Sequence, residues 1–181
     1  MAKSFAQIAR NRRTVYEFSD RPVSTKLVWR ILDLARWAPS SHNDQNWHFV
    51  IVANPKTINE IFDHCVYGSF YSVPPVVVAV VAEPIYDKKP GLKSTGVVSL
   101  NEYHRYINVG FVASQIVNGA EALGLGSCIV TPTDQRANAL LRVVSPAHVA
   151  VVIGLGYPKR LSFKRKRERK PLEQLVSYEK R

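Results

Sequence analysis

The amino-acid sequence predicts a single domain of the α/β or α+β class, with a central sheet flanked by helices. Its 181 residues fall at the upper end of ordinary single-domain size, so one core is expected over residues 1–181. The hydrophobic fraction of 46% is typical of a globular protein. Segments patterned as strands alternate along the chain with segments patterned as helices, which favours a sheet covered by helices.

The first third of the chain predicts two helices, a polar loop and a strand. Residues 4–11 are expected to form a short helix that turns three apolar side chains inward: Phe5, Ile8 and Ala9. Ser24 is a suitable N-cap for a second helix, which runs to about residue 37 because its apolar positions repeat at the spacing of one buried face. A polar loop over residues 40–46 and a strand over residues 47–53 follow.

The middle of the chain predicts two further helices and a buried strand between them. Asn54 caps a helix that begins at Pro55, a position where a proline is tolerated. Residues 76–82 are a β-branched run that predicts a strand buried on both faces. A long helix is expected over residues 101–123, ending before Gly124. Its expected inward positions are Tyr103, Tyr106, Ile107, Gly110, Ala113, Val117 and Ala120.

The last third predicts a short strand over residues 127–131, a helix capped by Asp134 and a third buried strand over residues 149–155. The tail that follows is first basic and then mixed in charge. Residues 83–100, with their prolines and glycines, are the least regular stretch of the chain.

The positive charge of the chain is concentrated in one segment. The net charge is +11, but residues 159–170 hold eight Lys or Arg and one Glu, so this segment alone carries +7. Such a cluster can bind a nucleic acid, an acidic membrane surface or a single phosphate group. No apolar run approaches the ~20 residues that a membrane helix needs.

The cysteines and the N-terminus point to a reducing compartment. Cys65 and Cys128 lie far apart and without the spacing of metal ligands, so we expect buried, reduced thiols, no metal site and a cytoplasmic location. Residues 1–10 contain no apolar segment of the kind that directs secretion.

Three distant segments have side chains suited to holding an anion or an aromatic ligand. Arg12, Arg13 and Thr14 place two guanidinium groups beside a hydroxyl, which can grip a phosphate, although a solvated helix end also explains an arginine pair. Residues 39–46 are rich in small donors and acceptors, as are many ligand-binding loops and ordinary turns. Residues 167–169 add two arginines, for which a solvated tail is the simplest interpretation.

Together with two further motifs, these segments resemble the FMN-dependent nitroreductase family. Residues 12–18 resemble the family's opening RRS-x-R-x-F, and residues 38–47 resemble its APSxxNxQPW loop. Residues 122–128 are similar to the ALGLGSC turn that follows the family's long central helix. Residues 154–158 resemble the xGYP end of its last core strand, and residues 167–172 resemble its closing RxRxPL. Five motifs in the family's order span nearly the whole chain.

The resemblance implies a three-layer α+β fold, with a central mixed sheet flanked by helices, in a homodimer with two FMN molecules at the subunit interface. Residues 159–181 would belong to both the site and the dimer. The loop over residues 40–46 would meet the flavin largely from the partner subunit. The implied cofactor-binding residues are Arg12, Arg13, Thr14, Tyr16, Ser40, Ser41, Asn43, Gln45, Thr131, Pro132, Arg167 and Arg169.

The implied activity is hydride transfer from NADH or NADPH, through flavin N5, to a small electron-poor acceptor such as a nitroaromatic, a quinone or a flavin, in a ping-pong sequence. The flavin performs the redox chemistry in this scheme, so no side chain is assigned a catalytic role. Phe70 and Tyr71 precede a predicted strand and are candidate acceptor-binding residues, although core packing also explains aromatic residues there.

Two residues depart from the family's pattern. Tyr16 stands where a basic residue is common, which puts in question one contact to the pyrimidine edge of the flavin. Asn46 replaces the proline before Trp47, and we expect this change to loosen the loop without removing its side-chain donors. Residues 83–100 form a shorter segment than the helical insertion of many larger members. Because that insertion usually helps to shape the substrate pocket, the substrates of those members cannot be assumed for this chain.

Two other functions are compatible with the sequence. A flavoprotein of this fold could act as a dehydrogenase or a dehalogenase, or could store flavin, and turnover of NAD(P)H with a nitroaromatic or quinone separates these from a reductase. A basic nucleic-acid-binding domain is the third hypothesis, motivated by residues 159–170. Binding of a nucleic acid would weaken steeply with rising salt concentration, but the sequence contains no recognisable nucleic-acid-binding motif.

Overall fold

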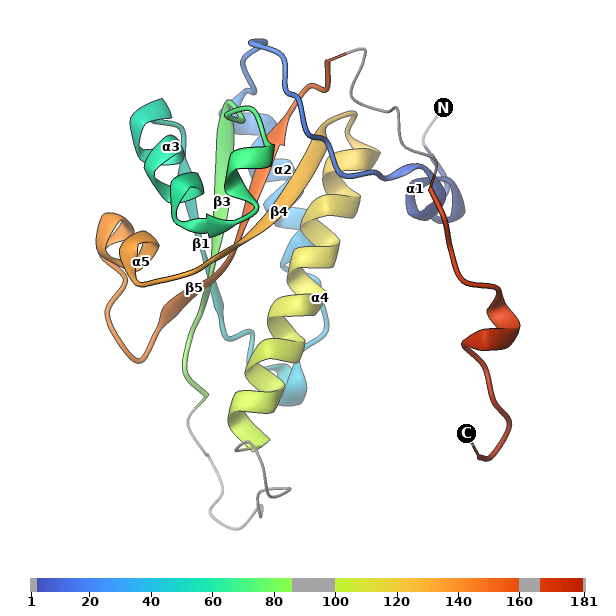
Figure 1. Cartoon of the computed structure of the whole chain (residues 1–181). Coiled ribbons are helices and arrows are strands. Elements are labelled where there is room, and N and C mark those ends of the chain that lie inside the picture. Colours follow the sequence, from blue (N-terminus) through green and yellow to red (C-terminus); the bar gives the residue numbers. More distant parts are fainter. Residues whose placement is uncertain (1–2, 86–99, 160–166, 181) are drawn as a thin grey trace.

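The computed structural model describes residues 3–85, 100–159 and 167–180 (Figure 1). Within these residues five strands form a sheet in the order β1-β3-β5-β4-β2, with antiparallel neighbours throughout. The strands are β1 (Trp47–Val52), β2 (Cys65–Val66), β3 (Val76–Ala82), β4 (Gly126–Pro132) and β5 (His148–Gly156). The helices are α1 (Phe5–Asn11), α2 (Thr25–Ala35), α3 (Pro55–Asp63), α4 (Leu100–Ala122) and α5 (Arg136–Leu141), with short 3-10 turns η1 (Ser41–Asn43), η2 (Gly68–Phe70) and η3 (Leu172–Gln174).

The central strand β3 divides the core into two parts. All seven of its residues are buried, and successive side chains point to opposite faces of the sheet. Val76, Val78, Val80 and Ala82 pack with α2 and α4, while the residues between them pack with α3 and α5. Figure 1 shows these two helix pairs on opposite sides of the sheet. The three layers and the α+β class are confirmed.

The predicted starts of α2 and α3 are confirmed by their capping bonds. Ser24 Oγ accepts a hydrogen bond from the N–H of Leu27 at 3.3 Å, and α2 buries one apolar face. Asn54 Oδ1 accepts from the first turn of α3, and Pro55 is the first residue of that helix. The predicted cap of α5 is displaced by one residue: Gln135 is the N-cap residue, and Asp134, just before it, accepts at Oδ1 from the N–H of Arg136 at 2.7 Å. These bonds satisfy N–H groups that have no partner within the helix.

The long helix α4 turns a partly different face inward from the one predicted. Tyr103 and Tyr106 are 58% and 50% exposed, and Gly110 is exposed as well, so these three predictions are wrong. The reason is that two polar residues, Arg105 and Asn108, belong to the buried face and bond to groups from other segments. The remaining buried positions are apolar or small and include the predicted Ala113, Val117 and Ala120.

The short helix α1 also differs from its prediction. Ser4 forms the expected kind of cap, but Phe5 is 77% exposed and α1 contributes none of the described buried side chains. The helix lies beside the C-terminal end of α4, where Lys3 Nζ meets Glu121 Oε1 at 2.6 Å, and therefore stands outside both core layers.

The segment after α1 runs along the edge of the sheet. The N–H of Val15 donates to the carbonyl of Ser127 at 2.9 Å, and Thr14 forms a parallel bridge to Ser127. Among the described residues this bridge is the only parallel pairing, so the mixed character expected of the sheet is confined to it. A Cβ on Gly126 would overlap the side chain of Val15, which explains why a glycine stands at this close approach.

The structure also describes both cysteines and all five helices named above. Cys65 and Cys128 are free and buried, as predicted, and burial raises the pKa of each thiol to about 12. The described residues contain no group of His, Cys, Asp or Glu suited to a metal ion. None of the described helices combines the length and apolar character that crossing a membrane requires. Most of the irregular stretch 83–100, and residues 160–166 of the basic segment, lie outside the described residues.

Candidate functional site

The first and last of the predicted binding segments meet at the end of α1. Arg12 is the C-cap residue of this helix. The guanidinium group of Arg167 donates from Nη1 to the carbonyls of Arg10 at 2.5 Å and Arg12 at 3.1 Å, and from Nη2 to that of Ala9 at 3.3 Å. The last carbonyls of a helix carry partial negative charge, which favours a cation there. Arg167 therefore joins the C-terminal segment to the segment that begins at Arg12.

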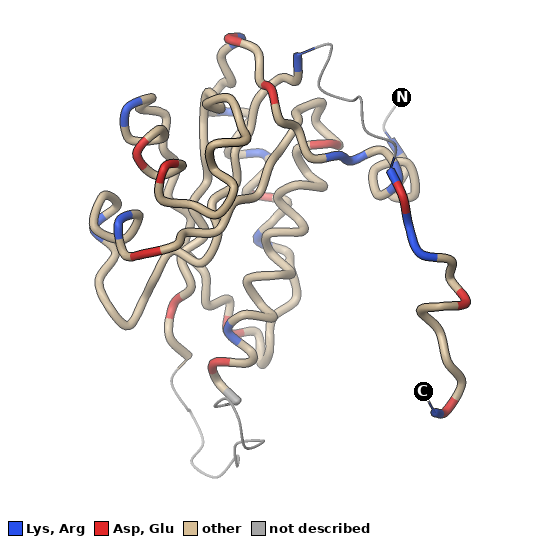
Figure 2. Tube along the Cα trace, viewed as in Figure 1, with Lys and Arg blue, Asp and Glu red and all other residues tan. Residues whose placement is uncertain are grey.

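This meeting point is strongly positive, and we call Arg12, Arg13, Arg167 and Arg169 the arginine cluster. Figure 2 shows the basic residues of the two segments close together beside α1. The pKa of Arg167 is lowered by desolvation and then by the positive charges of Arg169, Arg12 and Arg13. An anion relieves such repulsion, and forked guanidinium donors match the oxygens of a phosphate. The donor set therefore fits a phosphate group.

Tyr16 connects this segment to the predicted acceptor residues. Tyr16 is 37% exposed, and its ring stacks on the ring of Tyr71, with the ring centroids 5.2 Å apart and the planes within 4°. Thr14, two residues earlier, is half-buried at its bridge to Ser127. An aromatic contact thus occupies the position where the family's pattern has a basic side chain.

Tyr71 is held in place by several contacts. Its ring meets the ring of Phe62 edge-on, with centroids 6.3 Å apart and planes at 90°. The N–H of Ser72 donates to the carbonyl of Tyr16 at 2.9 Å, and the N–H of Phe18 donates to Ser72 Oγ at 2.7 Å. Burial, followed by the nearby Cys128 and Tyr16, raises the pKa of the Tyr71 phenol. The phenol is therefore neutral at physiological pH.

Phe70 and the predicted flavin-facing residues of β4 lie in adjoining segments. Phe70 is 66% exposed, and its ring tilts against that of Tyr67 with centroids 5.7 Å apart. Just before these residues, β2 pairs with β4 at Thr131 and Pro132. The sequence did not predict β2, because a strand of two residues has no recognisable periodicity.

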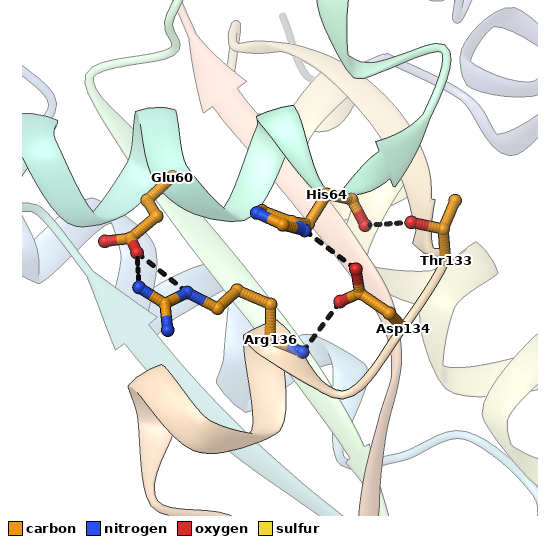
Figure 3. A network of polar contacts seen from close by, with 5 residues as sticks. All are labelled: Glu60, His64, Thr133, Asp134 and Arg136. Carbon is orange, nitrogen blue, oxygen red and sulfur yellow. Dashed lines mark hydrogen bonds and ion pairs between the residues drawn. The ribbon is translucent and has the colours of Figure 1, made fainter.

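A polar network fixes this junction (Figure 3). The N–H and Oγ1 of Thr133 donate to the carbonyl of His64 at 2.8 and 2.9 Å, and His64 Nδ1 lies 2.7 Å from Asp134 Oδ2. The N–H of Arg136 and then the hydrogen bond with His64 lower the pKa of Asp134. Arg136 also pairs with Glu60. The network fastens the end of α3 to the start of α5 and so holds β2 against β4.

The polar loop over residues 40–46 lies far from the arginine cluster. The N–H of Ser41 donates to Asn108 Oδ1 on α4 at 3.1 Å, whereas α1 meets α4 at Glu121. Asn108 and Glu121 are separated by about 20 Å along the helix axis. In one chain, therefore, the predicted loop residues do not join the arginine cluster: Ser40, Ser41, Asn43 and Gln45.

Asn46 anchors this loop, so the expectation that it loosens the loop is wrong. Its side chain is 6% exposed, its Oδ1 accepts from Asn108 Nδ2 at 2.7 Å, and its Nδ2 donates to the carbonyl of Glu83 at 3.2 Å. Sequence reasoning missed this pair. The sequence offers little signal for this pair beyond the presence of an amide side chain, Asn108, among apolar positions of α4.

Fold and site together define a three-layer α+β domain with a phosphate-compatible arginine cluster at the edge of its sheet. The chain belongs to the nitroreductase family, which residues 9–157 match. The resemblance carried by the five motifs is thereby confirmed.

Similar proteins carry several names. A protein of Methanothermobacter thermautotrophicus, provisionally named NADH dehydrogenase/NAD(P)H nitroreductase, is 32% identical over 155 residues, which cover 82% of this chain and 74% of that protein. An iodotyrosine deiodinase of Thermotoga neapolitana is 29% identical over 171 residues, covering 86% and 89%. A provisionally named nitroreductase of Desulfovibrio desulfuricans, crystallised with FMN, has a TM-score of 0.76 over 99% of both chains at 23% identity, which shows the fold.

Proposed function

We propose that this chain is an FMN-dependent oxidoreductase that transfers hydride from NADH or NADPH to a small electron-poor acceptor. The observation that carries the proposal is the convergence of the arginine cluster from two ends of the chain, because its donors suit the phosphate of FMN. Membership of the nitroreductase family supports the same cofactor. The FMN complex of the Desulfovibrio desulfuricans protein adds further support.

The members of the arginine cluster would have two different roles in binding the phosphate. Arg12, Arg13 and Arg169 would face it, and the hydroxyl of Thr14 would donate a further hydrogen bond. Arg167 acts differently, because its donors already bind the last carbonyls of α1. Arg167 would hold the two basic segments together, so that their positive side chains lie close to one another.

The isoalloxazine ring would lie along the segments that follow the cluster, near Thr131 and Pro132, with Tyr16 beside it. When bound, FMN supplies the redox chemistry by taking a hydride from the nicotinamide and passing it to the acceptor. The exposed ring of Phe70 would contact the acceptor, and Tyr71 would support Tyr16 from the core side. The described residues bind and orient the reactants, and we assign none of them a catalytic role.

We further propose that the working unit is a homodimer. The loop over residues 40–46 lies about 20 Å along α4 from the arginine cluster, so a second copy in antiparallel orientation would bring its loop to the cluster. Two exposed apolar surfaces suit such a contact. The outward face of α4 presents Tyr103, Tyr106 and Phe111. The C-terminal segment, which runs away from the sheet in Figure 1, presents Leu172, Leu175 and Val176.

We propose that residues 1–181 act as one domain in the cytoplasm. The two buried free thiols fit a reducing compartment. The basic segment is then explained by a single phosphate and by the partner subunit, without a nucleic acid or a membrane.

The purified protein tests the proposal through its absorption spectrum and its turnover. We expect a flavin spectrum, release of one FMN per chain on denaturation, and oxidation of NADH or NADPH that depends on an added nitroaromatic or quinone. A colourless protein that takes up no FMN would contradict the proposed cofactor. A flavin-loaded protein without NAD(P)H turnover would contradict the proposed activity.

Reductive dehalogenation is a second candidate, favoured by the iodotyrosine deiodinase relative. In that reaction the two electrons of the reduced cofactor and a proton replace an aryl carbon–iodine bond with a carbon–hydrogen bond, and iodide leaves. Release of iodide from an iodinated phenol, measured beside nitroaromatic reduction on the same preparation, distinguishes the two activities.

A further inference from the structure

The loop over residues 40–46 has an unusual backbone for a segment without glycine. His42, Asn43 and Gln45 have φ angles of 52°, 56° and 47°, in the left-handed region that L-residues mostly avoid because their Cβ atoms meet the backbone. The N–H of Gln45 donates to Ser40 Oγ at 3.0 Å, and its side-chain amide donates to the carbonyl of Asn43 at 3.3 Å. Such a backbone persists only where the surrounding structure holds it.

Asn108 on α4 holds this loop at two points. Its side chain is fully buried. Its Oδ1 accepts from the N–H of Ser41 at 3.1 Å, near the start of the loop. Its Nδ2 donates to Asn46 Oδ1 at 2.7 Å, at the end of the loop. The left-handed residues therefore lie between two attachments to one amide group.

Asn46 extends the attachment to the end of β3. Its Nδ2 donates to the carbonyl of Glu83 at 3.2 Å, and the N–H of Glu83 donates to the carbonyl of Asn46 at 3.0 Å. The two asparagines thus form a chain of buried amides between α4 and the segment after β3. Buried amides keep such bonds because a rotated side chain would leave donors and acceptors unpaired away from water.

We propose that the Asn46–Asn108 pair is a positioning element, which sets the loop in the conformation that meets the cofactor of the partner subunit. This inference rests on the proposed function, because it takes the loop to be a cofactor-binding loop. A proline at residue 46, usual in the family, would restrict the backbone through its ring. Here two hydrogen-bonded amides provide the restriction, and a loop fixed before the ligand arrives has less freedom to lose on binding.

The test compares two buried asparagines. Titration of the apoprotein with FMN, followed by flavin fluorescence, should show that Asn108→Ala raises the Kd about tenfold or more, because the loop must then be ordered during binding. The matched control is Asn138→Ala. Asn138 is also buried, and its Oδ1 accepts from the N–H of Val149 at 2.7 Å, but this bond joins α5 to β5. The control should lower the thermal unfolding temperature similarly and leave the Kd for FMN within about twofold.

The possible outcomes separate this inference from the proposed function. It is wrong if Asn108→Ala binds FMN as the wild type does, or if both variants weaken FMN binding equally. If Asn108→Ala does not fold, Asn46→Ala removes the same hydrogen bond from the loop side and should raise the Kd to a similar extent. A wild-type protein that binds no FMN would overturn the proposed function, and this inference with it.

Discussion

The ring of Tyr16 lies parallel to the ring of Tyr71, with centroids 5.2 Å apart and planes 4° apart. The contact joins the segment that carries Arg12 and Arg13 to the segment that carries the candidate acceptor residues. The hydrogen bond from the N–H of Ser72 to the carbonyl of Tyr16 fixes the same two segments at the backbone. The proposed cofactor-binding and acceptor-binding parts of one chain are therefore physically connected.

Removing this ring contact should weaken acceptor binding. We expect Tyr16→Ala to raise the KM for an aromatic acceptor by up to about tenfold, because Tyr71 then loses a stacked partner that contributes ~0.5–1.5 kcal/mol and this side of the site must be ordered when the acceptor binds. Tyr16→Phe keeps the ring and should behave as the wild type. Steady-state kinetics at a fixed NADH concentration measures the effect. An unchanged KM in Tyr16→Ala would show that the stacked pair does not shape the acceptor site.

The arginine cluster should recognise the phosphate of the cofactor rather than its ring. We expect Arg13→Ala to raise the Kd for FMN about ten- to a hundredfold, since a hydrogen bond to a charged group contributes ~1.5–3 kcal/mol. Binding of riboflavin, which has no phosphate, should change little in the same variant. Arg36→Ala is the control, because Arg36 pairs with Asp33 on α2. Equal losses for FMN and riboflavin would contradict the assigned role.

The network around Asp134 predicts a pH-dependent contribution to stability. The pKa of Asp134 is lowered in the folded chain, so its ionised form stabilises the fold. This contribution is complete above the unfolded-state pKa of about 3.9 and is lost as the pH falls through the lower folded-state pKa. Asp134→Asn should therefore unfold at a lower temperature than the wild type near neutral pH, with a difference that shrinks in acid. Calorimetry that finds the same difference at every pH would contradict this origin.

The close approach at Gly126 predicts a packing defect. A Cβ at this position would overlap the side chain of Val15, so Gly126→Ala should destabilise the fold by about 1–3 kcal/mol, as overpacking does elsewhere. Gly119→Ala is a matched control, because its new Cβ would lie at 3.6 Å from Ile31 Cγ2, an ordinary contact. The control should be neutral or stabilising by up to about 1 kcal/mol through helix propensity. Urea unfolding measures both, and a neutral Gly126→Ala would contradict the packing described.

The fold class and the helix starts could be predicted because their causes are local. A capping side chain such as Ser24 or Asn54 bonds within the next turn, and apolar spacing defines a buried face within the same helix. The inward face of α4 was mispredicted where this locality fails. Arg105 bonds to the carbonyls of Ala82 and Pro146, and Asn108 bonds to the loop over residues 40–46, so distant partners allow these polar side chains to be buried.

The candidate site shows the same limit. The arginines stand out in the sequence because Arg12 and Arg13 are adjacent and only Glu168 separates Arg167 from Arg169, and the structure places the two segments together. The Asn46–Asn108 pair and the pairing of His64 with Asp134 gave no comparable signal, because each joins residues that are ordinary by themselves. Their importance depends on hydrogen bonds that only the folded chain creates.

Mixing two defective subunits tests the central claim most directly. The claim is that each FMN site takes its arginine cluster from one chain and its polar loop from the partner. Arg13→Ala and Gln45→Ala should each bind FMN weakly as separate homodimers. Refolding the two variants together should restore tight FMN binding, because one site of each mixed dimer would hold both defects and the other neither. If cluster and loop came from the same chain, every site would keep one defect, so the absence of any recovery would contradict the account.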